Sequence, residues 1–116
     1  GLLATFQNVV VHGANSEEYV TAAYLTSSKM EEIIADKSSQ GYDFVINANY
    51  NTSENLAGNF VGYTRTLNIF EVNSNDLITP QANTGYKRVV VSVVSPGGAT
   101  VTYETLLTLW GVPLGL

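Results

Sequence analysis

Two runs of β-branched and aromatic residues near the C-terminus face each other across a short turn. Residues 86–95 read YKRVVVSVVS, residues 99–110 read ATVTYETLLTLW, and Pro96-Gly97-Gly98 lies between them. This arrangement predicts a β-hairpin. One arm is apolar on both faces over several residues, so we expect it to be the central strand of a sheet that a helix covers.

An amphipathic helix is predicted in the first third of the chain. Asn15 and Glu18 have the spacing of a helix N-cap and its reciprocal acceptor, and Ser38-Ser39-Gln40-Gly41 is a stop signal that ends in a C-cap glycine. The expected buried stripe repeats every three or four residues along residues 16–37. It consists of Val20, Ala23, Ser27, Met30 and Ile34, with Ile33 beside them.

The stretch before this helix, GLLATFQNVVV over residues 1–11, is mostly apolar, but a membrane span needs about 20 residues. Composition alone leaves two interpretations equally open, namely the end of a longer apolar helix or an ordinary buried turn or strand. Gly13 weakens the case for a continuous helix without excluding it. We favour one long helix over residues 1–38, with a bend near Gly13.

Between the helix and the hairpin, the sequence predicts one strand and two long loops. Residues 42–48 fit a short strand or an ordered loop, and residues 49–59 and 73–85 are polar connections. Residues 60–72, FVGYTRTLNIFEV, alternate between two faces, one of which carries Val61, Tyr63, Arg65, Leu67 and Ile69. The order of elements predicts a single α+β domain over residues 1–116. Its long N-terminal helix packs on a small antiparallel β-sheet of three or four strands within residues 42–110.

The composition excludes several partners. The net charge is -5, and the lysines and arginines are limited to Lys29, Lys37, Arg65, Lys87 and Arg88. A nucleic-acid-binding surface needs a basic stripe and anionic lipids attract a basic cluster, so we expect neither contact. The chain has no cysteine, which excludes disulfides and cysteine-ligated metals.

Catalytic candidates are few, and we expect no enzyme activity, no cofactor and no metal. His12 is the only histidine, and we interpret it as a solvated helix residue. Glu17-Glu18 and Glu31-Glu32 are adjacent pairs on the predicted helix, where neighbours point in different directions. They therefore do not form the facing carboxylates that glycoside hydrolysis needs.

Three weaker patterns concern binding. Calcium takes oxygen ligands, but the four candidate carboxylates have no calcium-loop spacing: Asp36, Asp43, Glu54 and Asp76. Asn51-Thr52-Ser53 matches a glycosylation sequon. Tyr42, Tyr50 and Tyr63 could form a sugar-binding or interface patch, but we expect them to line the helix–sheet interface. We expect Trp110 to fill the core.

Five blocks resemble, in order, a bacterial type IV pilin-like protein. They read GLLATFQ, AAYLTSSKMEEIIADK, GYTRTLNI, YKRVVVSVVSPGG and VTYETLLTLWG. The blocks span most of the chain, and their order is more specific than any one of them. The resemblance is to minor pilins of the type IV pilus modification protein kind and to minor pseudopilins of type II secretion.

The resemblance implies a structural minor subunit that assembles through its N-terminal helix. Residues 1–11 would then be the end of a longer membrane helix, with the peptidase site upstream, so no processing residue is carried over. The implied partners are other pilin or pseudopilin subunits and, for the full-length form, the inner-membrane assembly platform and the prepilin peptidase. The implied location is the inner membrane with a periplasmic domain, followed by an extracellular or periplasmic filament.

One alternative stays open. The tyrosines and the asparagine-rich loops also fit an adhesive or carbohydrate-binding module of a cell surface or phage. Strong, saturable glycan binding would favour that function over a filament subunit.

Overall fold

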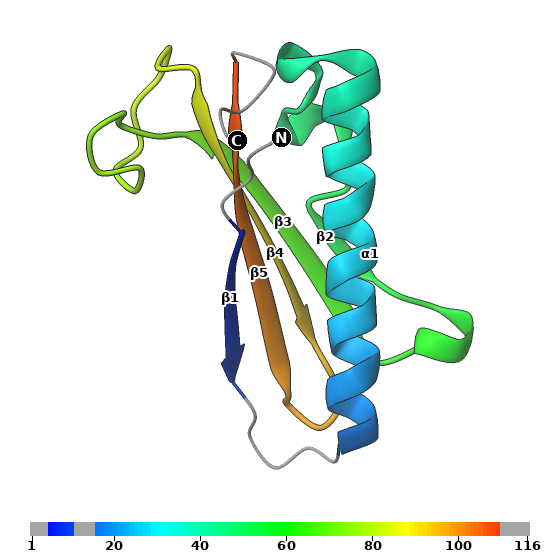
Figure 1. Cartoon of the computed structure of the whole chain (residues 1–116). Helices are drawn as coiled ribbons and strands as arrows, with labels where there is room; N and C mark the ends of the chain where they lie inside the picture. Colours follow the sequence, from blue (N-terminus) through cyan, green and yellow to red (C-terminus); the bar gives the residue numbers. More distant parts are fainter. Residues whose placement is uncertain (1–4, 11–15, 110–116) are drawn as a thin grey trace.

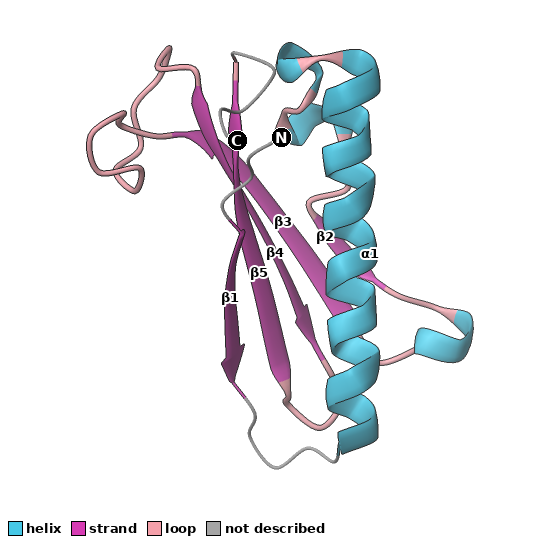
Figure 2. Cartoon of the chain, viewed as in Figure 1, coloured by secondary structure: helices cyan, strands magenta, loops and turns pink. Residues whose placement is uncertain are grey.

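The α-helix α1 (Ser16–Gln40) lies across one face of an antiparallel sheet (Figure 1). The computed structural model describes residues 5–10 and 16–109. The elements are β1 (Thr5–Val10), α1 (Ser16–Gln40), the 3-10 helices η1 (Tyr42–Phe44) and η2 (Asn47–Asn49), β2 (Ser53–Asn55), η3 (Gly58–Phe60), β3 (Thr64–Glu71), β4 (Tyr86–Val94) and β5 (Thr100–Thr108). The strand order is β1-β5-β4-β3-β2, and every neighbouring pair is antiparallel (Figure 2).

The predicted α+β class is confirmed, because α1 packs on an antiparallel sheet, mainly on β4 and β5. Four of its strands, β2 to β5, lie within residues 42–110 as predicted, and β1 adds a fifth strand at the edge of β5. The predicted hairpin is β4 and β5, and β4 lies at the centre of the sheet. The predicted end of the helix is also confirmed, because Gly41 adopts φ 97° and its N–H donates to the carbonyl of Lys37. No helix in the described part of the chain is both long and apolar enough to span a membrane.

The prediction of one helix over residues 1–38 is wrong at its start. Thr5–Val10 form β1, which pairs with β5 from Thr5 opposite Thr105 to Val10 opposite Thr100, and α1 begins at Ser16. The β-branched and aromatic content of TFQNVV suits a strand, and β1 satisfies the backbone groups along the edge of β5. Gly13 and the predicted N-cap Asn15 lie outside the described residues.

The buried side of α1 is rotated from the predicted stripe. The residues that α1 buries are Ala22, Leu25, Thr26, Lys29, Met30 and Ile33. Val20, predicted to be buried, is 61% exposed. Thr26 is tolerated in the core because its hydroxyl donates to the carbonyl of Ala22 at 2.7 Å, which satisfies the polar group within the helix.

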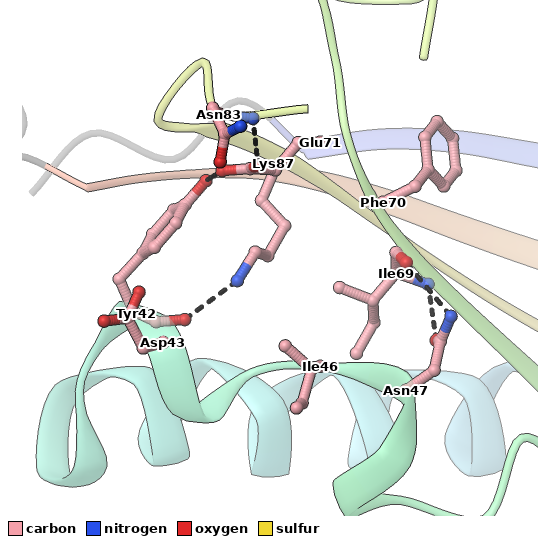
Figure 3. Close-up of a pocket in the computed structure, with 9 residues that line it drawn as sticks. All are labelled: Tyr42, Asp43, Ile46, Asn47, Ile69, Phe70, Glu71, Asn83 and Lys87. Atoms are coloured by element: carbon pink, nitrogen blue, oxygen red, sulfur yellow. Dashed lines mark hydrogen bonds between the residues drawn. The ribbon is translucent and has the colours of Figure 1, made fainter. Parts of the chain in front are cut away.

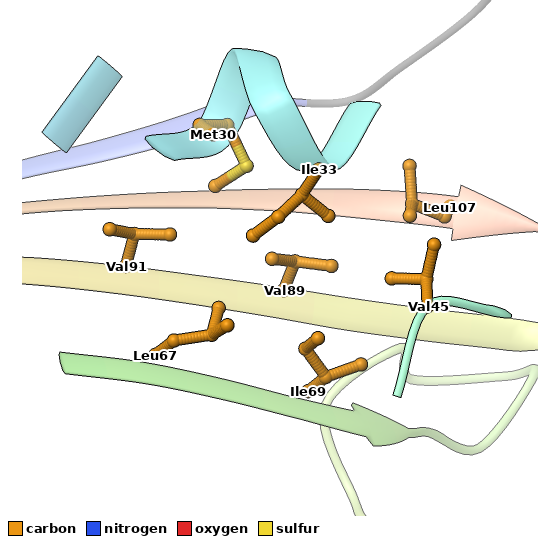
Figure 4. Packing of buried hydrophobic residues seen from close by; sticks show 8 residues of the cluster. All are labelled: Met30, Ile33, Val45, Leu67, Ile69, Val89, Val91 and Leu107. Atoms are coloured by element: carbon orange, nitrogen blue, oxygen red, sulfur yellow. The ribbon is translucent and has the colours of Figure 1, made fainter. Parts of the chain in front are cut away.

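Two apolar clusters hold α1 on the sheet. The larger one joins the second half of α1 to the inner face of β3, β4 and β5 (Figure 4), and it contains Met30, Ile33, Val45, Leu67, Ile69, Val89, Val91 and Leu107. The smaller one lies under the first half of α1 and contains Ala22, Leu25, Tyr63, Val93 and Val101. The inward positions of β4 alternate, and Leu67 and Ile69 of β3 are buried as the sequence predicts. Val61, predicted on the same face, precedes β3 and is 71% exposed.

The turn between β4 and β5 is fixed by the start of α1. The Glu18 carboxylate accepts hydrogen bonds from the Ser95 hydroxyl at 2.8 Å and from the Gly97 N–H at 2.9 Å. A Cβ at Gly97 would lie 2.5 Å from a Glu18 carboxylate oxygen, so a larger residue there would displace the Glu18 side chain from the turn. Glu18, predicted as an N-cap partner, thereby ties the helix to the hairpin.

Replacement of Ile33 by alanine should lower the free energy of unfolding by about 2–4 kcal/mol, because Ile33 is fully buried and a cavity would remain. Urea denaturation followed by circular dichroism measures this change. Glu31→Ala, on the exposed side of α1, should cost less than about 0.5 kcal/mol. Equal losses in the two variants would contradict the observed orientation of the helix.

Candidate functional site

A pocket of ≈ 390 Å³ opens where the loop carrying η1 and η2 meets the ends of β3 and β4 (Figure 3). Four segments of the chain line it, with Tyr42, Asp43, Ile46, Asn47, Ile69, Phe70, Glu71, Asn83 and Lys87. Because a buried lysine, a buried tyrosine and a carboxylate meet in it, this pocket is the candidate site.

Lys87 occupies an inward position of β4, on the same face as the core valines, and is only 5% exposed. Its Nζ donates hydrogen bonds to the carbonyl oxygens of Tyr42 and Val45 at 2.9 and 2.8 Å. The ammonium also lies 3.9 Å from the centroid of the Tyr42 ring, which favours the cation. Burial lowers the pKa of Lys87, against the opposing effect of the Glu71 and Asp43 carboxylates.

Glu71, at the end of β3, connects two loops through one carboxylate. The Tyr42 hydroxyl donates to Oε2 at 2.7 Å, and the backbone N–H of Asn83 donates to Oε1 at 2.7 Å. The bond from Tyr42 is the main cause of the lowered pKa of Glu71. Burial, followed by the bond to Glu71, raises the pKa of Tyr42, so its hydroxyl stays protonated.

Asn47 closes the other side of the pocket. Its side-chain amide accepts a hydrogen bond from the N–H of Ile69 at 2.8 Å and donates to the carbonyl of Ile69 at 3.1 Å, as a paired strand residue would. The side chains of Tyr42, Glu71, Lys87 and Asn47 therefore bind one another or the backbone. Among the described residues, no buried side-chain nitrogen or oxygen lacks a hydrogen-bond partner.

This arrangement fixes a loop more readily than it performs chemistry. Lys87 and Tyr42 direct their protons to acceptors of the same chain, so neither is poised to transfer a proton to a bound molecule. Together, Lys87, Glu71 and Asn47 tie residues 41–50 to the end of the sheet.

A second hollow, of ≈ 350 Å³, lies beside the second half of α1. Lys29 pairs there with Glu32 at 3.5 Å, and its Nζ lies 5.6 Å from the centroid of the Tyr50 ring. The Tyr50 hydroxyl donates to the Asp36 carboxylate at 2.8 Å. Burial, and then this bond, raises the pKa of Tyr50. These contacts attach the η2 loop to α1.

The four carboxylates considered as calcium ligands, Asp36, Asp43, Glu54 and Asp76, lie at separate places in the fold. Asp36 binds a tyrosine hydroxyl of the η2 loop, and Glu54 forms an ion pair across β2 and β3. Asp76 accepts hydrogen bonds from backbone N–H groups of its own loop, and Asp43 lines the pocket. In residues 5–10 and 16–109, no group of three metal-binding side chains is present.

The remaining candidate residues of the sequence analysis do not meet in one site within the described part of the chain either. Glu18 contacts the hairpin turn while Glu17 is exposed, so this pair does not face one site. Asn51 is exposed in the loop before β2, and glycosylation there stays a prediction. His12 and Trp110 lie outside the described residues.

The three tyrosines do not form one patch. Tyr63 lies in the core cluster under the first half of α1, which confirms its predicted place at the helix–sheet interface. Tyr50 packs against the larger cluster, and Tyr42 lies at the pocket.

The network around Lys87 was not predicted. Its signal in the sequence is a single charged residue at an inward position of an otherwise apolar strand face, the face of Val89, Val91 and Val93. Such a position requires buried partners, but alternation alone does not identify them.

No protein-family model, curated protein or solved structure matches the chain.

Tyr42→Phe should raise the pKa of Glu71 toward its ordinary value of 4.5, because it removes the main hydrogen bond that lowers it. A lowered carboxyl pKa stabilises the fold above pH 4.5, and the stabilisation is lost as the pH falls through the folded-state value. The variant should therefore lose more unfolding free energy at pH 7 than at pH 3. An NMR titration of the Glu71 carboxyl carbon measures the pKa directly.

Tyr50→Phe is the matched control, since it removes a similar hydroxyl that bonds to Asp36 instead. It should leave the Glu71 titration unchanged. An unchanged Glu71 pKa in Tyr42→Phe would show that the bond from Tyr42 does not stabilise the carboxylate.

Proposed function

We propose that the chain is the globular part of a structural minor subunit of a type IV pilin-like filament. The observation that carries the proposal is the match between the resembling sequence blocks and the elements. Residues 22–32 lie within α1, residues 63–69 overlap β3, and residues 86–98 form β4 and its turn. Three blocks that are separate in the sequence thus make up one helix-on-sheet unit.

A contact between the hairpin turn and α1 also supports this proposal. The Pro96-Gly97-Gly98 turn is bound by Glu18, so the hairpin block contacts the helix α1, which carries the block over residues 22–37. The same contact aligns the start of α1 with one end of the sheet (Figure 1). The loop over residues 73–85 projects from the opposite end and offers an outer surface for contacts.

Assembly through a longer N-terminal helix would require β1 to detach from β5. The resemblance assigns residues 1–11 to the end of a longer helix, whereas Thr5–Val10 pair with β5. β1 is an edge strand, so its release breaks only one ladder. In the proposed mechanism, β1 leaves β5 and extends α1. The extended helix then exchanges lipid contacts for contacts with similar helices in the filament core.

The proposal also sets the location and the partners of the full-length subunit. The longer helix would hold it in the inner membrane, where the prepilin peptidase and the assembly platform act on it. Other pilin or pseudopilin subunits would then surround it in an extracellular or periplasmic filament.

A cysteine pair at Asn8 and Thr102, which are opposite each other in the β1–β5 register, tests this mechanism. The chain has no other cysteine, so oxidation should lock β1 to β5 specifically. In cells that assemble the full-length protein, the locked subunit should be missing from sheared filaments. The reduced double variant and both single-cysteine variants should be present, as measured by immunoblotting.

Two outcomes would count against the proposal. Assembly of the locked subunit at the unlocked level would refute the release of β1. Absence of every variant, including the unmodified chain, from the filament fraction would refute the filament function itself. Saturable binding on a glycan array in that second case would favour the adhesive module.

A further inference from the structure

The outward side of α1 carries apolar residues that the sheet does not cover. Val20 and Tyr24, about one turn apart, are 61% and 60% exposed. The Tyr24 ring lies 6.4 Å, between centroids, from the ring of Phe60 in η3, and the next residue, Val61, is 71% exposed. We name Val20, Tyr24, Phe60 and Val61 the α1–η3 patch. A helix that packs on one sheet is normally polar on its outward side, so the patch indicates a second contact.

Acidic residues lie at both ends of this outward stripe. Glu17 and Glu31 share the helix face of Val20 and Tyr24, and both are exposed. They are separated by about 21 Å along the axis at the usual helical rise. The remaining acidic residues of α1 have intramolecular partners: Glu18 binds the hairpin turn, Glu32 pairs with Lys29, and Asp36 binds Tyr50.

The cations of the chain are already engaged. Each lysine and arginine contacts a group of its own chain: Lys29 with Glu32, Arg65 with Glu54, Arg88 with Glu104, Lys87 with two backbone carbonyls, and Lys37 with a further group. A second copy of the chain therefore brings no available lysine or arginine to Glu17 and Glu31. Charge complementarity favours a different protein as the occupant of the patch.

We infer that the α1–η3 patch docks an amphipathic helix of a neighbouring protein, whose apolar stripe is flanked at both ends by lysine or arginine. The apolar stripe covers Val20, Tyr24 and Val61, and the flanking cations pair with Glu17 and Glu31. The inference names a partner for the proposed subunit and rests on that function for its biological setting. The docking geometry itself needs only the isolated chain.

A synthetic helical peptide is the probe. It carries leucines at helical spacing over about five turns, with one lysine pair near each end. A control peptide has the same residues in an order that disperses the leucines around the helix. Fluorescence anisotropy measures binding, and backbone NMR shifts locate it. The striped peptide should bind at least about tenfold more tightly than the dispersed one, with shifts centred on residues 17–31 and 58–61.

Matched variants distinguish peptide binding at the α1–η3 patch from a general attraction of the cationic peptide to an acidic protein. Val20→Ser should weaken binding roughly tenfold, because it removes buried apolar area from the complex. Ile78→Ser, at a residue 64% exposed in another loop, should change binding less than about twofold. Replacing Glu17 and Glu31 by glutamine should weaken binding and reduce its dependence on salt. The melting curves of these variants should match that of the unmodified chain, because the residues are exposed.

Three other outcomes would overturn the inference. Equal binding of the two peptides, or equal losses in Val20→Ser and Ile78→Ser, would show that charge alone attracts the probe. Dimers of the chain that Val20→Ser dissociates in sedimentation would assign the patch to a second copy. Because these measurements use the isolated chain, their failure leaves the result of the filament-shearing experiment intact.

Discussion

The fold depends on burial of the inner face of β4 beneath α1. Val89, Val91 and Val93 are fully buried there, and β4 is the central strand, so α1 covers them while β3 and β5 flank them. Burying each such side chain contributes about 1.5–3 kcal/mol, which makes this row the strongest single reason for the helix to lie where it does. The position of α1 then determines which other residues are brought together.

Polar contacts fasten the start and the second half of α1 to the rest of the chain. At its start, Glu18 binds the hairpin turn, and in its second half Lys29 and Asp36 hold the η2 loop through Tyr50. Lys87 continues the inward row of β4 beyond the valines, where its ammonium binds two carbonyls of the η1 loop. The candidate pocket thus lies at the end of the same face of β4 that forms the core. The charged groups of Lys87 and Glu71 hold the loops that surround it.

The sequence was most informative where the period of the pattern was unambiguous. β4 alternates from Tyr86 to Val93 and β3 from Thr66 to Ile69, so their inward residues were predictable, as were the hairpin and the helix-ending Gly41. The buried side of α1 was less predictable, because hydrophobicity predicts that Val20 is buried and Lys29 is exposed, whereas the reverse is observed. Lys29 is buried because it contacts Glu32 and Tyr50.

The strand β1 and the Lys87 network could not have been derived from local pattern. The apolar content of TFQNVV is compatible with a strand and with the end of an apolar helix, and pairing with the edge of β5 makes it a strand. The partners of Lys87 are backbone carbonyls from a distant loop. Because every residue has a backbone carbonyl, the sequence does not identify which ones bind the lysine.

The central claim is that α1 and β4 form the stable unit, while β1 is an edge strand that can leave it. Native-state hydrogen exchange tests this most directly in the isolated chain. The account predicts that the hydrogen-bonded amides of β4 exchange only through global unfolding. The amides of β1 should exchange through local opening, with protection at least roughly tenfold lower. Equal protection of β1 and β4 would contradict the claim, because β1 would then open only when the whole fold does.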